Sequence, residues 1–280
     1  MSVPRIDAHY HVWDLRARPQ PWTGAFPALQ RSFGIDELRP SLARHHIGAT
    51  VVVQTVADAG ETPELLTLAA SDPAIAGVVG WTDLTAPGVA DRLAALAAPE
   101  LVGIRHLVQD EPDPDWLTRR EVQAGIAAVG AAGLAYDLLV IPAQLPAAIE
   151  TVRRQPGVRF VLDHGAKPLI RDRVLEPWGA LIDGLAAAPN VAVKLSGLVT
   201  EAPADPAPDD LRPYCDRLLA AFGPDRVMFG SDWPVCLLAC DYDRTIELAE
   251  GACAGLSAAE QASVFGGTAA RWYAIKPPEI

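Results

Sequence analysis

Eight short apolar segments, separated by stretches with helical character, run through this chain of 280 residues. Such alternation is typical of βαβ units around a parallel sheet. Most of the segments are almost continuously apolar, as expected of strands that are covered on both faces. Eight units in a chain of this length favour one closed (β/α)8 TIM barrel over an open sheet. We predict a single α/β domain over residues 1–280, with strands at 5–11, 50–55, 78–82, 102–107, 135–140, 158–163, 191–196 and 226–231.

The segments between these strands carry recognisable helix ends. Asp36 is placed to cap a helix that runs to about residue 46, and Gly48 to end it before the second strand. Pro63 suits the first turn of a helix over 64–70. Ser257, followed three residues later by a glutamate, predicts a capping box for the last helix.

Composition narrows the possible partners and the cellular compartment. The formal charge of −12 argues against binding to nucleic acid or to anionic membranes. A small neutral or zwitterionic substrate remains compatible with it, and an anionic one would need a locally basic pocket. No apolar run reaches the roughly 18 residues that a membrane span needs, and the N-terminus does not resemble a signal peptide. The cysteines form no Cys-x-x-Cys pair, which predicts free thiols in a reducing, cytoplasmic setting; they are Cys215, Cys236, Cys240 and Cys253. The oligomeric state stays open.

Two histidines one residue apart, His9 and His11, occupy the first predicted strand. In an extended strand alternate side chains share a face, so both imidazoles should point to one side together with Asp7, and Ala8 and Tyr10 to the other. Taken alone, the pair fits surface histidines as well as a functional site.

Polar residues gather at the carboxyl ends of the predicted strands, where barrel enzymes build their active sites. Four of the chain's six histidines lie there, whereas His45 and His46 follow a helix and should complement its dipole and the solvent. The longer connections 15–33, 109–116 and 197–213 also follow strands and would form the rim, the two acidic ones as solvated loops. The strand-end residues are His9, His11, Gln54, Trp81, Arg105, His106, Asp163, His164, Lys167, Lys194, Ser196, Asp232 and Trp233.

These residues resemble the pattern of the amidohydrolase superfamily, through His9-x-His11, His164 and Asp232. The similarity spans nearly the whole chain. Within the superfamily, the sequence motifs are most similar to those of the sugar-lactonase and 2-pyrone-4,6-dicarboxylate-lactonase branch. They are Asp7-Ala8-His9-x-His11-x-Trp13-Asp14, Gly103-Ile104-Arg105-His106, Leu162-Asp163-His164-x-x-Lys167-Pro168, Lys194-Leu195-Ser196-Gly197, Gly230-Ser231-Asp232-Trp233-Pro234 and Phe265-Gly266-Gly267-Thr268-Ala269-Ala270-Arg271.

The chain departs from the two-metal members of that superfamily. They use a carboxylated lysine or a glutamate on strand four and a histidine on strand five, where this chain has Arg105 and Asp137. A two-metal site is therefore not expected. One divalent ion, such as zinc or manganese, would find suitable ligands in His9, His11, His164 and Asp232. The resemblance to lactonases instead implies that no cofactor is required, and we favour this interpretation.

The resemblance implies hydrolysis of a sugar-acid lactone of the L-rhamnono, L-fucono or galactono type. Asp232 would activate water, and His9, His11 and His164 would polarise the carbonyl. The substrate would contact Trp13, Trp81, Arg105, His106 and Trp233. Lys194 would be a charge inside the barrel, paired with Asp163 or Asp232, and Lys167 a loop residue.

Two alternative functions stay open. The first is a mononuclear metal-dependent amidohydrolase or decarboxylase of the same superfamily. The second is a catalytically silent barrel that binds a ligand; the intact set of His9, His11, His164 and Asp232 argues against it.

Overall fold

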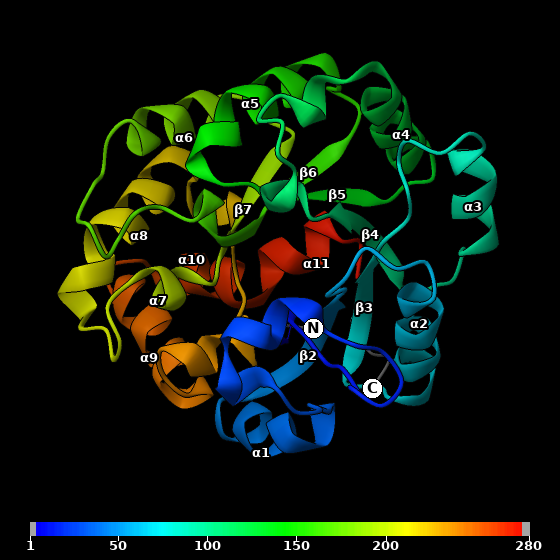
Figure 1. Cartoon of the computed structure of the whole chain (residues 1–280). Helices are drawn as coiled ribbons and strands as arrows, with labels where there is room; N and C mark the ends of the chain where they lie inside the picture. Colours follow the sequence, from blue (N-terminus) through cyan, green and yellow to red (C-terminus); the bar gives the residue numbers. More distant parts are fainter. Residues whose placement is uncertain (1–3, 276–280) are drawn as a thin grey trace.

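Eight parallel strands form one sheet in chain order in the computed structural model, which describes residues 4–275 (Figure 1). Each strand pairs with the next one along the chain, which is the topology of a (β/α)8 TIM barrel. The eight predicted strands and the predicted fold class are confirmed. The strands are β1 Arg5–Tyr10, β2 Ile47–Val53, β3 Ile75–Gly80, β4 Leu101–His106, β5 Ala135–Leu138, β6 Arg159–Leu162, β7 Val191–Leu195 and β8 Val227–Phe229.

Helices surround this barrel and cover its outer face (Figure 1). They bury apolar side chains against the outward-facing residues of the strands, such as Tyr136 on β5 and Phe160 on β6, so that one continuous core lies between helices and sheet. The α-helices are α1 Ile35–Arg44, α2 Glu61–Ser71, α3 Val89–Ala95, α4 Arg120–Ala131, α5 Leu145–Arg154, α6 Trp178–Ala186, α7 Leu198–Glu201, α8 Pro208–Phe222, α9 Tyr242–Ala252, α10 Ala258–Ala262 and α11 Thr268–Trp272.

The barrel closes through backbone hydrogen bonds between the end of β1 and the segment that follows β8. The Asp232 N–H donates to the His9 carbonyl at 2.7 Å, and the His11 N–H donates to the Trp233 carbonyl at 2.6 Å. We call this contact the barrel seam. It joins two segments that carry three of the four predicted catalytic residues, so closing the sheet also assembles the site.

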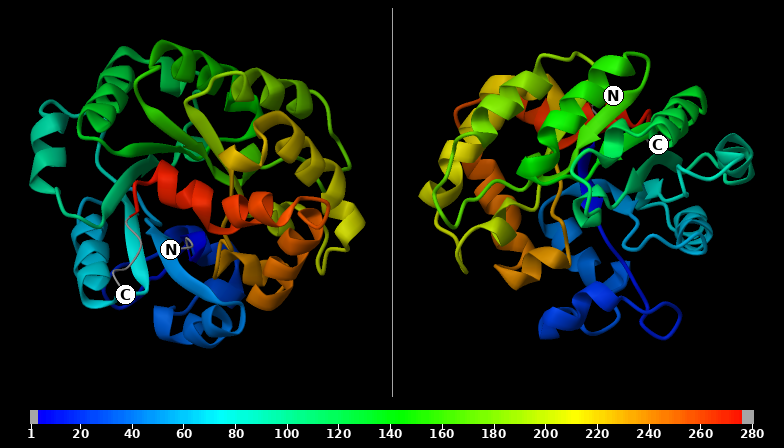
Figure 2. Two further views of the ribbon diagram at one scale, coloured as in Figure 1. Left: turned by 180° about the vertical axis from the view of Figure 1, so that it is seen from behind. Right: turned by 45° about the horizontal axis from the view of Figure 1, so that its top comes forward.

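The half of the barrel interior nearest α11 is filled by small and medium apolar side chains, including Ile6, Ala8 and Val161. Helix α11 crosses the end of the barrel that is opposite the carboxyl ends of the strands, as the view from behind shows (Figure 2). Ala269 on α11 and Tyr273 just after it pack against these interior residues. The barrel is therefore a packed core that is closed at one end and carries polar side chains only toward the other.

Several predicted helix and strand ends differ from the structure. Strand β2 begins at Ile47, so Gly48 lies inside the strand and does not end the preceding helix. Helix α1 has Gly34 at its N-cap, and Asp36 instead lies in its first turn, where a carboxylate favours the helix dipole. Helix α2 begins at Glu61, which leaves Pro63 in the first turn as expected. The Ser257 capping box is confirmed, since its side chain accepts from the Glu260 N–H.

Asp7 does not share a face with the two histidines, contrary to the strict alternation expected of a strand. The pairing of β1 with β2 shifts register between Asp7 and Tyr10, which is the signature of a β-bulge. Ala8 therefore joins the barrel interior while Asp7 turns to the seam. Its Oδ1 accepts from the Ser231 N–H at 2.9 Å and from the His9 N–H at 3.2 Å.

Two further expectations concern cysteines and membranes. The four cysteines are free thiols, three of them buried and Cys240 partly exposed. Within residues 4–275, every helix is too short or too polar to cross a bilayer. The predicted absence of a membrane-spanning helix agrees with this part of the chain.

Because Asp7 connects β1 to the segment after β8, its removal should weaken the seam. We expect Asp7→Ala to lower the free energy of unfolding by about 3 kcal/mol, since two hydrogen bonds to a buried carboxylate are lost. Asp7→Asn keeps an acceptor oxygen and should cost less than half as much. Urea denaturation of both variants tests this, and equal losses would contradict a hydrogen-bonding role for the carboxylate.

Candidate active site

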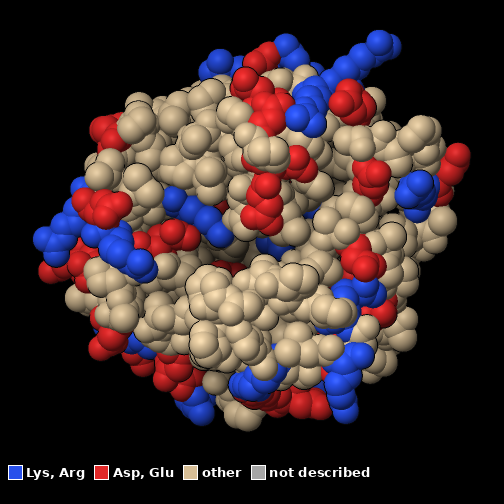
Figure 3. All heavy atoms as spheres, in the orientation of Figure 1, with Lys and Arg blue, Asp and Glu red and all other residues tan. Residues whose placement is uncertain are grey.

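His9, His11, His164 and Asp232 meet at the carboxyl ends of the strands, although they come from three distant parts of the chain. Oδ1 of Asp232 lies 3.3 Å from Nε2 of His11, 3.6 Å from Nε2 of His9 and 4.0 Å from Nε2 of His164. All four side chains are buried. In the same orientation as Figure 1, the surface is hollowed at the centre of this face, with acidic and basic groups around the opening (Figure 3). The four predicted catalytic residues are thus brought together.

Two of these residues hold unusual backbone conformations. Asp232 has φ of 56° and His164 has φ of 54°, in the left-handed region that non-glycine residues rarely adopt. Such conformations cost on the order of 1–3 kcal/mol and persist where the surrounding structure enforces them, which is often at functional sites. At Asp232 the seam hydrogen bond to His9 provides this enforcement. These backbone conformations direct the side chains of Asp232 and His164 toward each other at the carboxyl end of the barrel.

Hydrogen bonds orient two of the imidazole rings. Nδ1 of His11 lies 2.7 Å from the Val53 carbonyl oxygen. A carbonyl can only accept, so this nitrogen carries a proton. The ring of His164 is held from below by Ser196, whose hydroxyl oxygen lies 2.9 Å from Nδ1.

Burial sets the charge states of the site. Burial lowers the pKa of His164 to about 4, although the Asp232 carboxylate opposes the shift. Burial and then the Lys194 charge hold the pKa of His9 well below its usual value of 6.5. Burial would raise the pKa of Asp232, but the imidazoles of His164, His11 and His9 outweigh it and lower the pKa. At neutral pH an ionised carboxylate therefore faces the neutral imidazoles of His9 and His164.

A layer of paired charges lies directly beneath the site, and we call it the charged layer. Nζ of Lys194 lies 2.5 Å from Oδ2 of Asp137 and 2.9 Å from Oδ1 of Asp163. NH1 of Arg105 lies 3.1 Å from the other oxygen of Asp163, and its NH2 donates to the Gln54 carbonyl. Lys194 is thus paired with Asp163, one of the two predicted partners, and with Asp137 in place of Asp232.

The charged layer contains a residue that the sequence reasoning did not select. Asp137 lies on β5 in an otherwise apolar run, is fully buried, and accepts a hydrogen bond from the Tyr273 hydroxyl at 2.6 Å. Burial, opposed by the Lys194 charge, raises its pKa to about 6. An acid at an inward position of one strand and a lysine on another were the available signal, because neither tolerates burial without a partner.

One wall of the opening is formed by Trp81, His106 and the segment after β4. The Trp81 indole N–H donates to Nδ1 of His106 at 3.1 Å, so Nε2 of that ring carries the proton and donates to Glu111 at 2.8 Å. The same imidazole stacks on Trp116, with ring centroids 4.3 Å apart. The acidic segment 109–116 was expected to be a solvated loop, and Asp110 and Asp115 are indeed exposed. Glu111 and buried Trp116, however, contact His106.

Trp13 and Trp233 belong to an aromatic cluster at the base of the segment 15–33. Phe33 contacts both indoles edge to face, with centroids 5.0 Å from Trp13 and 5.5 Å from Trp233. The Trp13 indole N–H donates a hydrogen bond to the Arg31 carbonyl. These contacts hold the first long connection against the seam, and Trp13 is oriented by this packing.

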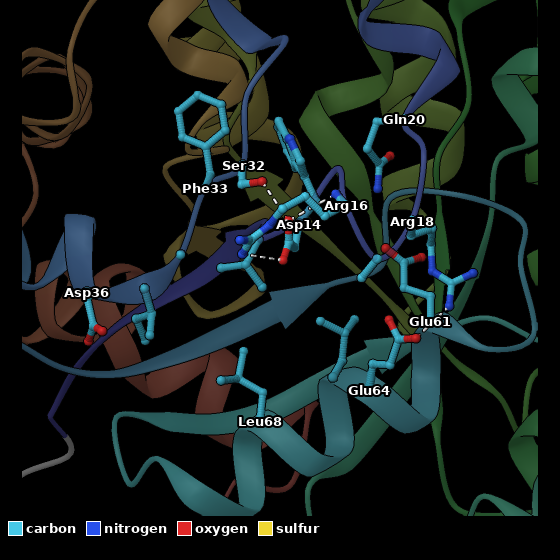
Figure 4. A pocket seen from close by; sticks show the side chains of 16 residues that line it. Asp14, Arg16, Arg18, Gln20, Ser32, Phe33, Asp36, Glu61, Glu64 and Leu68 are labelled. Atoms are coloured by element: carbon cyan, nitrogen blue, oxygen red, sulfur yellow. Dashed lines mark hydrogen bonds and ion pairs between the residues drawn. The ribbon is translucent and has the colours of Figure 1, made fainter.

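A cavity of about 420 Å³ lies behind this cluster, between the segment 15–33 and α2 (Figure 4). Four of its charged lining groups form two ion pairs, Arg16 with Asp14 and Arg18 with Glu64. Trp13 lines it, whereas the predicted catalytic histidines and Asp232 are not among its lining residues. The cavity is therefore separate from the candidate active site.

The distances at the site also suit one metal ion. A tetrahedral ion with ligands at about 2.1 Å requires donor atoms about 3.4 Å apart. Nε2 of His9 and Nε2 of His11 are 3.2 Å apart, and both lie close to Oδ1 of Asp232. These three residues, and separately His9, Asp163 and His164, form groups of possible ligands among the described residues. The nitrogen and oxygen donors are those that zinc accepts.

Comparison with known proteins places the chain in a family. The model of a family described as amidohydrolase matches residues 6–275, almost the entire chain. The chain belongs to the amidohydrolase family. This confirms the resemblance that the sequence motifs indicated.

Similar members of the family have been described in two Burkholderia species. An L-fucono-1,5-lactonase of Burkholderia multivorans is 44% identical over 99% of this chain and 98% of its own length. An L-fucono-1,5-lactonase of Burkholderia ambifaria is 42% identical over 98% and 97%. A crystal structure of a Burkholderia multivorans amidohydrolase with bound zinc superposes with a TM-score of 0.93 at 44% identity, covering 98% of this chain and 100% of the other.

Gly197 provides a test of the site's geometry. It has φ of +64°, and a Cβ there would overlap the imidazole of His164. Gly133 has φ of +77° but open space around it in the described structure. We expect both alanine variants to lower the free energy of unfolding by about 1 kcal/mol, because alanine disfavours the left-handed backbone conformation that glycine adopts freely.

Only Gly197→Ala should also displace His164, and we expect its kcat to fall at least tenfold while Gly133→Ala keeps the original kcat. Steady-state kinetics with the lactone substrate and thermal melts of both variants distinguish the two effects. Equal kcat values would show that the position of His164 is not critical.

Proposed function

We propose that this amidohydrolase-family protein hydrolyses the lactone ring of a sugar acid, with an L-fuconolactone as the first substrate class. The observation that carries the proposal is the ionised Asp232 surrounded by His9, His11 and His164 at the open end of the barrel. The substrate class is supported by the two full-length relatives named as L-fucono-1,5-lactonases. A neutral lactone also suits an acidic protein, since it is not repelled.

Asp232 is the proposed base. Its low pKa keeps it ionised across the neutral range, so it is always ready to take a proton from an attacking water. For the same reason it holds that proton weakly. It then releases the proton to the ring oxygen that departs when the carbon–oxygen bond breaks, which yields the open-chain sugar acid and regenerates the carboxylate.

The histidines and the charged layer stabilise the negative charge that develops on the carbonyl oxygen. As water adds to the carbonyl carbon, negative charge develops on the carbonyl oxygen, and donors fixed in advance lower the barrier most effectively. His9 lies between this position and the cations Arg105 and Lys194, whose nearest atoms are 3.4 Å and 3.1 Å from its ring nitrogens. Because these positive charges are buried, water screens them little, and their attraction for the oxyanion is stronger than it would be at the surface.

Other residues are proposed to bind the sugar. Trp81, which is partly exposed, offers a flat apolar surface, and the His106 ring, held between Trp81 and Glu111, orients it. Trp233 is buried against Phe33 and would support the site from beneath. Arg105 already pairs with Asp163, so we propose that it acts through its charge and does not form a bidentate contact with substrate.

A divalent ion is compatible with this site without being required by it. His9, His11 and Asp232 would hold it, and when bound it would polarise the carbonyl or acidify a water. Because Arg105 and Lys194 already supply positive charge close to these ligands, we propose metal-independent hydrolysis as the main activity.

The base is tested by Asp232→Asn, which keeps the shape and removes the charge. With a pH indicator and a panel of L-fucono-, L-rhamnono- and galactonolactones, we expect the wild type to prefer the L-fucono substrate. The variant should lose about 10²- to 10⁴-fold in kcat with its fold intact by circular dichroism. Near-normal turnover by the variant would rule out Asp232 as the base, and an inactive wild type would rule out the lactonase proposal.

The metal is tested by chelation. After treatment with a chelator and confirmation by elemental analysis that no ion remains, we expect at least half of the original kcat, because the charged layer persists. Readdition of zinc or manganese should not increase it. A loss of more than tenfold that either metal restores would instead support the mononuclear metal-dependent hydrolase.

A further inference from the structure

Lys194 is a fully buried lysine inside the barrel, and it contacts three groups. Nζ lies 2.5 Å from Oδ2 of Asp137, 2.9 Å from Oδ1 of Asp163 and 3.1 Å from Nδ1 of His9. Two carboxylates at these distances keep the ammonium charged despite its burial, since removing the proton would leave both acids poorly compensated. Lys194 is therefore a cation placed directly under a catalytic histidine.

The charged Lys194 ammonium can only donate hydrogen bonds, and this decides which ring nitrogen of His9 carries the proton. A lysine ammonium has three N–H groups and no lone pair. One of its protons is donated to Oδ2 of Asp137 and another faces Nδ1 of His9, whereas Asp163 is an ion-pair partner whose Oδ1 lies 2.9 Å from Nζ. Nδ1 of His9 must then present its lone pair. A neutral imidazole carries one proton, which consequently resides on Nε2.

The groups on the other side of the ring agree with this position. In the neutral form of His11, Nε2 has a lone pair, because the Nδ1 proton is donated to the Val53 carbonyl. It lies 3.2 Å from Nε2 of His9, so the proton of His9 has an acceptor there. NH1 of Arg105 lies farther away, 3.4 Å from the same nitrogen, and has Asp163 as its acceptor at 3.1 Å.

The alternative position of the proton is less favourable. A proton on Nδ1 of His9 could point to Oδ1 of Asp163 at 3.4 Å. It would also face the Lys194 ammonium at 3.1 Å, donor against donor. The lysine contact is the shorter of the two and has hydrogen-bond geometry, whereas the contact between Nδ1 and Asp163 is an ion-pair distance only.

We propose that Lys194 is a positioning residue that holds the proton of His9 on Nε2. One consequence is that Nε2 of His9 is a hydrogen-bond donor on the side of the ring that faces His11 and Asp232, where the lactone carbonyl would share its proton; this part rests on the proposed function. The other is independent of it. Nε2 has no lone pair to offer an ion in this state, so Lys194 weakens metal binding by the group His9, His11 and Asp232.

The proton can be located directly in the wild type. Nitrogen-15 NMR of histidine-labelled, metal-free protein distinguishes protonated from unprotonated ring nitrogens, and the His9 signals are identified by their absence in His9→Gln. We expect Nε2 to be protonated and Nδ1 to be unprotonated. A protonated Nδ1 would overturn the proposal whether or not any variant folds.

The role of Lys194 is tested by a matched pair of variants. Lys194→Met/Asp137→Asn removes one charge of each sign and leaves Asp163 with Arg105, whereas Asp137→Asn alone keeps the contact between Lys194 and His9. In the double variant the His9 proton should move to Nδ1, toward Asp163. In the single variant it should stay on Nε2. The same tautomer in both proteins would show that Lys194 does not control it.

Zinc titration and kinetics provide the remaining readouts. We expect the double variant to bind zinc at least tenfold more tightly than Asp137→Asn, and equal affinities would overturn the effect on metal binding. With the lactone substrate, kcat of the double variant should fall at least tenfold with KM nearly unchanged. A wild type that hydrolyses no lactone would overturn the proposed function alone, because the tautomer and zinc results do not depend on it.

Discussion

The hydrogen bonds of the barrel seam are the contacts on which the rest of the structure depends. They join the backbone of His9 and His11 to that of Asp232 and Trp233, and so close eight strands into a barrel at the position of the candidate active site. Asp7 strengthens the same contact from the outer side of β1. A backbone pairing of this kind places a carboxylate and two imidazoles within hydrogen-bonding range more rigidly than flexible loops could. Stability and site geometry are therefore coupled in this fold.

The charged layer is the second constraint. Two acids, Asp137 and Asp163, and two cations, Arg105 and Lys194, lie buried between the apolar interior of the barrel and the catalytic residues. Each charge is tolerated because it has a partner, and the removal of one would leave another uncompensated. The layer supplies positive potential beneath the site. The reaction can thus draw on fixed charges of the chain, which is the physical basis for proposing hydrolysis without a metal.

Periodicity and end signals predicted the architecture well. The eight strands were visible because buried parallel strands read as short apolar runs, and the Ser257 capping box was recognised from local chemistry. Helix and strand ends were less predictable. The end of α1 and the start of β2 were misplaced around Gly48, because a glycine inside a covered strand looks the same in sequence as a helix terminator. The position of Asp7 was wrong for another reason, since a β-bulge leaves no mark in the alternation it interrupts.

The sequence by itself determined which residues could form the site: a pair of histidines on one strand, a third after strand six, and an aspartate after strand eight, in a chain patterned as a barrel. Only the tertiary structure decided how they interact. Lys194 meets His9 across 185 residues of chain and Asp137 across 57, and such contacts follow from barrel closure and not from any local pattern. The same holds for the bond from His11 to Val53. Proton positions depend on these distant partners, because an imidazole takes its tautomer from whatever donor or acceptor the fold places beside it.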